Sequence, residues 1–559
     1  MMKKHSHRLT VLLFLSFSGY MSLYLGYTLP SMCSTLFSYD TMVVTTHLFS
    51  SSLLFDSTSV SFSAVVTFIS ANVFMFARYY MSGDIFYYRF VWLLFSFVIS
   101  MNILILAGSL FVLLLGWDGL GVSSFALIMY YESKESLAAS FLTLLINRLG
   151  DLIIMGSMVV FIFIGFSVLV SYPPVDLFLI FLLLSCAALT KSAQYPFCAW
   201  LPAAMAAPTP VSALVHSSTL VTAGVYIIIR ASTSNPLPME VGSMLLFFGS
   251  VTSFIGGLCA VYENDLKKLI ALSTLSQLGV MMFSLGLGAY NLALLHLFTH
   301  AMFKALLFLV AGCILLLSYG VQDIRLLGAL TKNSPLLLVF LNISGFCLMG
   351  LPFLSAFFSK HLILTAMWSY YVNIFSLLLM LFSTLLSSVY MIRLLKCLNW
   401  GPVATPLVAA PYYSPLFYTP MCFLFIGSCF LGWVLSAMDL HYSDSFFVPA
   451  WLDGVLYSVM LTGMGGGLLL SKLPARSLAV SMFYMAPVWC NINLLSYHLL
   501  AIVKALDYGW LEPMSYKAHL LNFLPSTIFN IVWPKTIMSF FPPIAFLGGV
   551  LVLCYYSLK

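Results

Sequence analysis

The sequence predicts an all-α polytopic membrane protein. Only 7% of its 559 residues are charged and 62% are hydrophobic, whereas about 25% of the residues in an ordinary soluble domain are charged. Apolar runs long enough to cross a bilayer follow one another along most of the chain. Two of these runs are interrupted by proline or glycine with a lysine nearby, which predicts two broken helices in an inverted repeat.

Composition also limits the partners and cofactors that we expect. The net charge of +6 is small for this length and forms no basic patch, so no nucleic-acid partner is expected. The eleven cysteines include no CxxC pair, which favours buried thiols over disulfides or metal ligands. No nucleotide, flavin or iron–sulfur motif is present, so we expect no cofactor in this chain and redox chemistry only in other subunits.

Window counting predicts about 14–16 transmembrane helices. The predicted parts are N-terminal spans (1–112), a first repeat with a broken helix (113–230), a second repeat with a broken helix (241–370), further spans (371–500), a lateral amphipathic helix (501–535) and a final anchoring span (536–559). The apolar run at about 9–29 is too long for a signal peptide and predicts a retained first span. The hydroxyl-rich stretch at about 31–59 is not predicted to span.

The first repeat begins with two spans that contain charged residues. The span at about 113–131 opens with GWDGLG, which places Asp118 near one end. The span at about 138–165 carries Arg148 and Asp151 on one helical face, where they could simply neutralise each other.

The first broken helix, at about 177–230, is the stretch around which the rest is organised. Four prolines interrupt it: Pro196, Pro202, Pro208 and Pro210. Proline removes a backbone donor and clashes with the preceding turn, so one continuous helix is not expected. Lys191 and His216 flank the break. A lysine at membrane depth costs at least about 2.5–3.5 kcal/mol and usually marks an ion or proton pathway.

The second repeat contains spans at about 241–262, 266–286 and 290–318 and a broken helix at about 335–370. Gly350 and Pro352 interrupt that helix, and Lys360 follows them. Asp265 precedes the span at 266–286, where its charge suits the helix N-terminus; Lys267 and Lys268 are expected on a solvated face. An alternative to the inverted repeat is that proline is simply common in membrane helices.

His296, His300 and Lys304 recur at four-residue spacing and form one stripe on an otherwise apolar helix. A proton relay accounts for all three residues, because imidazole titrates near neutral pH. A structural pair satisfied by hydroxyl groups is an alternative. A metal or haem site is another, but no further ligands are evident in the sequence.

The remaining chain is less polar. Spans are predicted at about 372–396, 416–436, 450–470 and 478–500. The segment at about 501–535 mixes charged and aromatic residues, which predicts a helix lying in the membrane interface. A last span is predicted at about 540–557.

Several motifs resemble one family. They are GWDGLG, NRLGD, PTPVSALVHSSTLVTAG, NDLKKLIALSTLSQLG, HLFTHAMFKALLF, QDIRLLGAL and GLPFLSAFFSK. They are similar to motifs of the antiporter-like subunits of respiratory complex I, densely over about 115–360. Lysine rather than glutamate at position 360 favours the distal pumping subunit over its subunit 4-like neighbour.

This resemblance implies a proton-translocating subunit of the mitochondrial inner membrane that adjoins other membrane-arm subunits, especially the subunit 4-like neighbour, with cardiolipin as a possible lipid. The implied pathway residues are Asp118, Lys191, His216, His296, His300, Lys304 and Lys360, with Arg148, Asp151 and Asp265 in support. Separation of an Asp118–Lys191 pair would release the Lys191 proton toward the histidines, Lys304 and finally Lys360.

Two residues depart from the family pattern. Asp118 replaces the usual glutamate, and His361 stands where aspartate usually follows the lysine. Three alternative functions are therefore kept: a subunit of a multi-subunit Na⁺/H⁺ antiporter, a haem-binding electron carrier that uses His296 and His300, and a structural arm that has lost pumping.

Overall fold

The computed structural model describes residues 11–22 (except 12), 35–44, 47–164, 178–328, 334–369, 373–401, 415–438, 450–469 and 500–504 (except 502). The elements named below belong to one compact unit, Met1–Tyr484. The predicted spans at 478–500 and 540–557 lie outside the described residues, apart from residue 500, as does the predicted lateral helix beyond residue 504.

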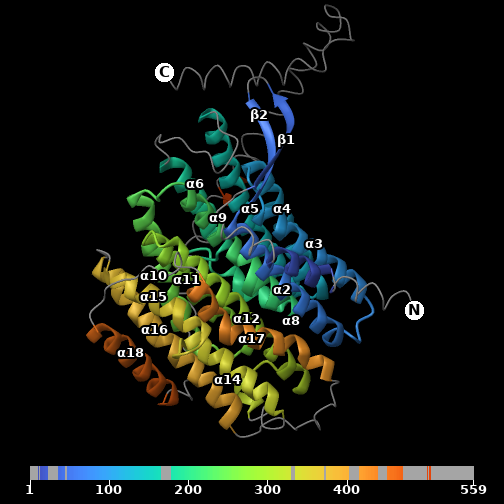
Figure 1. Cartoon of the computed structure of the whole chain (residues 1–559). Coiled ribbons are helices and arrows are strands. Elements are labelled where there is room, and N and C mark those ends of the chain that lie inside the picture. The colour runs from blue at the N-terminus through green and yellow to red at the C-terminus, as the bar shows by residue number, and fades with distance from the viewer. Residues whose placement is uncertain are drawn as a thin grey trace, which may run out of the picture. The chain divides into compact units, whose positions relative to one another are not determined.

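The all-α polytopic class is confirmed (Figure 1). The long helices are α2 (Ser57–Tyr80), α3 (Tyr87–Ile105), α4 (Leu110–Ile128), α5 (Lys134–Ile164), α6 (Phe178–Lys191), α9 (Leu220–Ser234), α10 (Met239–Tyr262), α11 (Leu266–Gly286), α12 (Tyr290–Leu317), α14 (Pro335–Met349), α15 (Ser355–Ser369), α16 (Ile374–Leu395), α17 (Pro415–Met438) and α18 (Ala450–Leu469). Within the described residues, eleven helical segments are long and apolar enough to cross a membrane.

Short elements complete the chain. They are the 3₁₀ turns η1 (Met129–Tyr131) and η2 (Ala204–Ala206), the short helices α7 (Trp200–Ala203), α8 (Thr209–Val211) and α13 (Ile324–Leu327), and the π-helices η3 (Ser212–Thr219) and η5 (Lys396–Trp400). Most of them lie where the sequence predicts the first break. The second break is the turn between α14 and α15, which Gly350 enters with a φ of 86°.

The hydroxyl-rich stretch before α2 forms a two-stranded antiparallel hairpin, which the all-α prediction did not include. It consists of β1 (Thr35–Val44) and β2 (His47–Phe55). The amide groups of Gly108 and Leu54 tie β2 to the α3–α4 connection, donating to the carbonyls of Ser52 and Leu106, each at 2.8 Å. Asp56 then begins α2 through a capping box with Ser59.

Helix α12 lies at the centre of the bundle. It packs against α2, α11, α14, α15 and α17 and against the π-helix η3. In its most apolar stretch, 94% of the residues are buried, as expected for a helix that is hydrophobic on all sides. Any polar side chain on this helix therefore faces protein rather than lipid.

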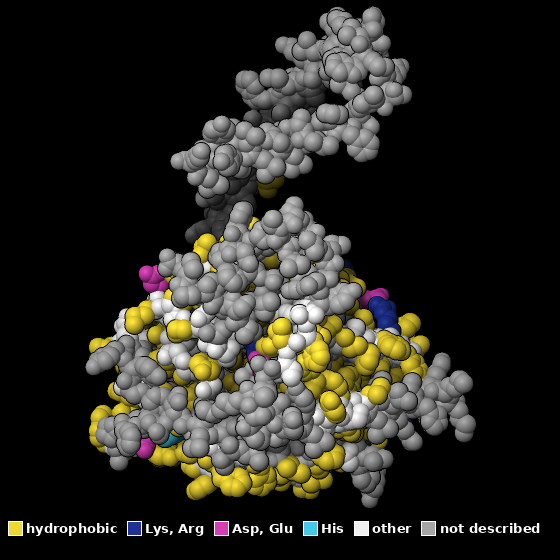
Figure 2. All heavy atoms as spheres, turned by 45° about the horizontal axis from the view of Figure 1, so that its top comes forward, with side chains coloured by type: hydrophobic (Ala, Val, Ile, Leu, Met, Phe, Trp, Pro, Cys, Tyr) yellow, Lys and Arg dark blue, Asp and Glu magenta, His cyan; other side chains and the backbone are white. Residues whose placement is uncertain are grey.

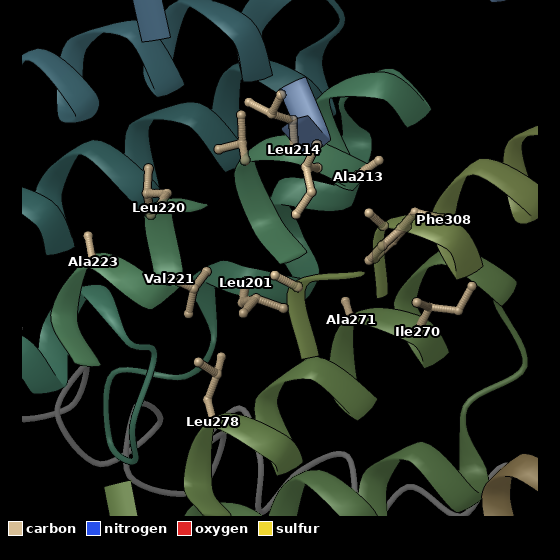
Figure 3. Close-up of a cluster of buried hydrophobic side chains, with 14 of the residues drawn as sticks. Leu201, Ala213, Leu214, Leu220, Val221, Ala223, Ile270, Ala271, Leu278 and Phe308 are labelled. Carbon is tan, nitrogen blue, oxygen red and sulfur yellow. The ribbon is translucent and has the colours of Figure 1, made fainter. Parts of the chain in front are cut away.

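Apolar side chains hold the first break against its neighbours. Leu201, Leu214 and Val221 from the broken segment belong to the same buried apolar cluster as Ile270 and Leu278 of α11 (Figure 3). All of them are buried. Irregular backbone survives at membrane depth only where protein or a wet cavity surrounds it, and this cluster supplies the protein.

The outer surface is apolar. Hydrophobic side chains dominate the described part of the face in Figure 2, with charged groups in a few separate places. On α5 the exposed side chains include Leu145, Leu149 and Leu152. In water such a surface would aggregate, so its natural surroundings are lipid or other membrane subunits.

Small residues let α10 and α11 approach closely. A Cβ atom on Gly249 would lie 2.7 Å from the backbone nitrogen of Phe283. A Cβ atom on Gly279 would lie 2.6 Å from the nitrogen of Ser253. Small residues at such contacts are typical of helix pairs in membranes, where close van der Waals packing drives association.

We expect Gly279→Val to force these helices apart and to destabilise the bundle by about 1–3 kcal/mol. Thermal unfolding of the intact complex that contains the variant measures this effect. Gly465→Ala in α18 is the control, because nothing lies within 4 Å of a Cβ atom there. Equal stability of the two variants would contradict the close-packing argument.

Candidate proton pathway

Lys191 ends α6 directly at the first break and is fully buried. Its ammonium Nζ donates a hydrogen bond to the Trp117 carbonyl of α4 at 2.8 Å. The same Nζ lies 3.7 Å from the centre of the Trp117 ring, a cation–π contact. The two groups that contact the Lys191 ammonium are therefore uncharged, and the ammonium can lose its charge by releasing a proton.

The expected direct pair between Asp118 and Lys191 is not formed. Within the part of the chain that the structure describes, Lys191 makes no ion pair. Instead, Arg148 Nη1 lies 2.9 Å from Asp151 Oδ2 and 3.5 Å from Asp118 Oδ1. Lys191 points to the Trp117 carbonyl instead, one residue before Asp118. The prediction that Arg148 and Asp151 neutralise each other agrees with this geometry.

This charged cluster is only partly covered. The side chain of Arg148 is 50% exposed, that of Asp118 39% and that of Asp151 14%. Both carboxylates share Arg148, and Asp118 directly follows Trp117, whose carbonyl accepts the Lys191 hydrogen bond. Arg148 can therefore influence Lys191 without touching it, by changing how much carboxylate charge remains unpaired.

His216 lies on the π-helix η3, fully buried. Neither of its ring nitrogens has a hydrogen-bond partner among the described residues. The Trp200 ring lies beside it, 6.3 Å away between centroids. Single π-helical turns occur often at functional sites, but nothing in the sequence beyond the nearby prolines indicated one here.

The α12 stripe is buried along its whole length. His296 Nδ1 lies 2.8 Å from Ser359 Oγ, and His296 Nε2 lies 3.3 Å from Gln277 Oε1. Because side chains contact both ring nitrogens, neither nitrogen is left for a metal ion, and the Ser359 contact fits both the relay and the structural pair satisfied by hydroxyl groups.

Further along the stripe, Lys304 Nζ donates to Ser273 Oγ at 2.6 Å. The rings of His296 and His300 lie 6.3 Å apart. His300 is fully buried, and both of its nitrogens lack a partner within the described ranges. Burying a polar group without a hydrogen-bond partner costs free energy. We therefore expect the His300 ring to bind water or a proton.

Lys360 lies beside the second break. Its Nζ donates to Ser387 Oγ at 3.0 Å and to the carbonyls of Leu348 and Met349 at 3.4 and 3.3 Å. These carbonyls belong to the last turn of α14, whose dipole favours a cation. The neighbouring Ser359 contacts His296, so the α12 stripe adjoins Lys360.

Residues around Asp265 divide into two environments. Asp265 lies 3.0 Å from Lys268, and both side chains are partly exposed. The expectation that Lys267 is solvated is wrong, because Lys267 is 6% exposed and donates to the Ala207 carbonyl at 3.2 Å. That carbonyl lies in the first break, which turns the Lys267 side chain inward. The structure brings Asp265 into no contact with the stripe.

The neutral groups that contact the buried lysines and histidines were not predicted from the sequence. They are the Trp117 carbonyl, Ser273, Gln277, Ser359 and Ser387. Their signal was present as hydroxyl and amide residues inside apolar runs. Only the packing of α11, α15 and α16 could show which of them meet the lysines and histidines.

Two broken helices beside a buried row of lysine and histidine define an antiporter-like membrane subunit. Residues 107–387 match the sequence model of the family described as "NADH:quinone oxidoreductase/Mrp antiporter, TM". Residues 42–91 match "NADH-Ubiquinone oxidoreductase (complex I), chain 5 N-terminus".

Relatives narrow this class. "NADH-ubiquinone oxidoreductase chain 5" of Mytilus edulis is 39% identical over 482 residues, 83% of this chain and 84% of the relative. The protein of the same name from Anopheles gambiae is 40% identical over 494 residues, 82% of each chain. The chain belongs to the NADH-ubiquinone oxidoreductase chain 5 family.

A solved structure has the same fold. A chain of the Mrp complex from Dietzia sp. DQ12-45-1b superposes with a TM-score of 0.74 at 22% identity. The match covers 95% of the present chain and 61% of that chain. At this identity the likeness concerns the fold alone.

Proposed function

We propose that this chain translocates protons as a membrane-arm subunit of NADH:ubiquinone oxidoreductase, driven by redox chemistry in other subunits. The observation that carries the proposal is the set of buried ionisable side chains at the two helix breaks and along α12. Ionisable groups at membrane depth are costly and mark ion or proton pathways. Hydroxyl and amide side chains contact three of these groups, Lys304, His296 and Lys360. These side chains supply hydrogen-bond partners for a transferred proton.

Arg148 acts as the switch at the first break in this proposal. When Arg148 engages Asp118 and Asp151, as here, little carboxylate charge is left to stabilise an ammonium on Lys191. When Arg148 moves away, the freed carboxylates attract and hold that charge. The attraction between unit charges at about 4 Å is on the order of 4 kcal/mol near a protein surface, enough to drive proton release and uptake.

The proton then moves along the centre of the bundle. The N–H bond at Lys191 breaks and a new N–H bond forms at the next acceptor, with water filling the gaps between side chains. His300 and His296 accept and release the proton beside Lys304. Ser359 links His296 to the neighbourhood of Lys360, the last lysine of the row.

The finer assignments belong to the same proposal. We place the chain in the mitochondrial inner membrane, next to other membrane-arm subunits, among them a subunit 4-like neighbour, with cardiolipin as a candidate lipid. We assign it no cofactor of its own. Family membership favours this function over an antiporter subunit or a haem-binding carrier.

The test is proton pumping by the intact complex with Lys360→Met. We expect fewer protons moved per NADH oxidised, because the variant keeps the side-chain volume but cannot carry a proton. Lys268→Met, which removes a half-exposed surface lysine, is the control. An unchanged proton-to-electron ratio in Lys360→Met would exclude the terminal role of this lysine.

A further inference from the structure

A histidine–carboxylate pair lies next to Lys360 and joins α15 to α18. His361 Nε2 of α15 lies 3.2 Å from Asp453 Oδ1 in the first turn of α18. The two atoms lack the alignment of a hydrogen bond, so their contact is an ion pair when His361 is protonated. From the sequence, His361 marked the loss of a carboxylate at this position. The fold supplies a carboxylate from a helix that begins about 90 residues later.

Aromatic rings fix the imidazole in place. The Phe357 ring lies 5.1 Å from the His361 ring at an angle of 33°, and the Tyr457 ring lies 6.2 Å from it at an angle of 30°. Phe357 is one helical turn before His361, and Tyr457 is one turn after Asp453. The same two turns that form the ion pair therefore also stack on the ring, which restricts its rotation.

Lys360 and His361 share a small cavity. Its other lining residues include Gly350 of the second break, Thr384, Tyr457 and Met460, and its volume is about 10 Å³. A cavity of roughly this size, about one probe sphere, is near the lower limit for holding one water molecule when polar groups line it. A single water between the ammonium and the imidazole would suffice to pass a proton between them.

Exposure rises stepwise along these three residues. Lys360 is 4% exposed, the His361 side chain 23% and the Asp453 side chain 45%. The series leads from the buried end of the lysine row to the surface. Among the described residues, the titratable groups facing His361 are Lys360, Asp453 and Tyr457.

We propose that His361 and Asp453 form the proton outlet of this chain, in place of a carboxylate directly after the lysine. This inference rests on the proposed function. The Nζ–H bond of Lys360 breaks, and an N–H bond forms on His361, directly or through the one water. The imidazolium, held by the Asp453 carboxylate, then loses the proton to water at the surface. The same steps run in reverse for uptake.

The test uses the intact complex in proteoliposomes, with the rate of proton movement and the protons moved per NADH oxidised as the readouts. We expect His361→Gln to slow proton transfer on the order of 10²-fold, since it removes the acceptor. Asp453→Asn is expected to act in the same direction with a smaller effect. The double variant should be no worse than His361→Gln alone, because the two residues act as one unit.

A rescue variant separates this role from a structural one. His361→Asp places a carboxylate directly after Lys360, so adding Asp453→Asn should then leave pumping well above that of Asp453→Asn alone. If Asp453 only contributes to packing, Asp453→Asn should reduce pumping equally in the parent chain and in the His361→Asp chain. That result would overturn the proposal. Glu240→Gln, another carboxylate in a first helical turn, is the matched control and should pump normally.

The outcomes also separate this inference from the proposed function. Normal pumping in His361→Gln and Asp453→Asn, with loss in Lys360→Met, would overturn the outlet alone. Normal pumping in Lys360→Met and in Lys191→Ala would overturn the proposed function and the outlet with it. Thermal stability of each complex is measured in parallel, so that a folding defect is not counted as a transport defect.

Discussion

Lys191→Ala is expected to abolish proton pumping while the chain still assembles into its complex. The side chain is fully buried at the first break, and among the described residues its ammonium contacts the Trp117 carbonyl and ring. Without the lysine side chain, Arg148, Asp118 and Asp151 have no proton-carrying group to act on. Assembly should persist, because the apolar contacts of the break do not involve the ammonium (Figure 3).

Two measurements check this expectation. The proton-to-electron ratio of the purified complex should fall, and native gels should show the complex at its normal size. Lys191→Met is the matched variant that keeps the side-chain volume, so a loss in both variants assigns the effect to the charge. Retained full stoichiometry in Lys191→Ala would exclude the residue from the pathway.

Substitution of Arg148 tests the same mechanism from the side of the carboxylates, with proton pumping as the measurement. If the arginine controls Lys191 by occupying carboxylates, Arg148→Met should leave Asp118 and Asp151 free and hold the proton on Lys191. Pumping should then slow rather than disappear. Asp265, which pairs with Lys268 away from the row, offers the control Asp265→Asn.

The helices were predictable because the bilayer imposes a simple rule on composition. Apolar runs and their proline interruptions placed most of the described spans to within a few residues, as for α10 (Met239–Tyr262) and α11 (Leu266–Gly286). The hairpin was not predicted. β1 and β2 are held by hydrogen bonds to each other, and β2 is also held by the hydrogen bond from the Gly108 amide to the Ser52 carbonyl. Such long-range contacts leave no helical periodicity in the sequence.

The candidate site was predictable in its residues but not in its pairings. An ionisable side chain in an apolar run stands out, so Lys191, His296 and Lys304 could be chosen from the sequence. Which atom meets which depends on helix rotation. A carbonyl such as that of Trp117 has no sequence signature, and Lys267 was predicted to be solvated because it lies at a helix start. The distant partner of His361 could not be foreseen at all.

Lys304→Met is expected to separate stability from function. Lys304 is fully buried in α12, and among the described residues its hydrogen-bond partner is the Ser273 hydroxyl. A charged or polar amine there is costly, and methionine fills nearly the same volume without that cost. We expect the variant to be as stable as the parent or more stable, by on the order of 1–3 kcal/mol.

Proton pumping in the same variant should be lost, because methionine can neither bind nor release a proton beside His300. Thermal unfolding and the proton-to-electron ratio, measured on one preparation, test both halves. Ser273→Ala removes the hydroxyl partner and should weaken pumping less, since the lysine remains. A stable Lys304→Met complex with full pumping would show that protons bypass the centre of α12, whereas an unstable one would assign Lys304 a structural role.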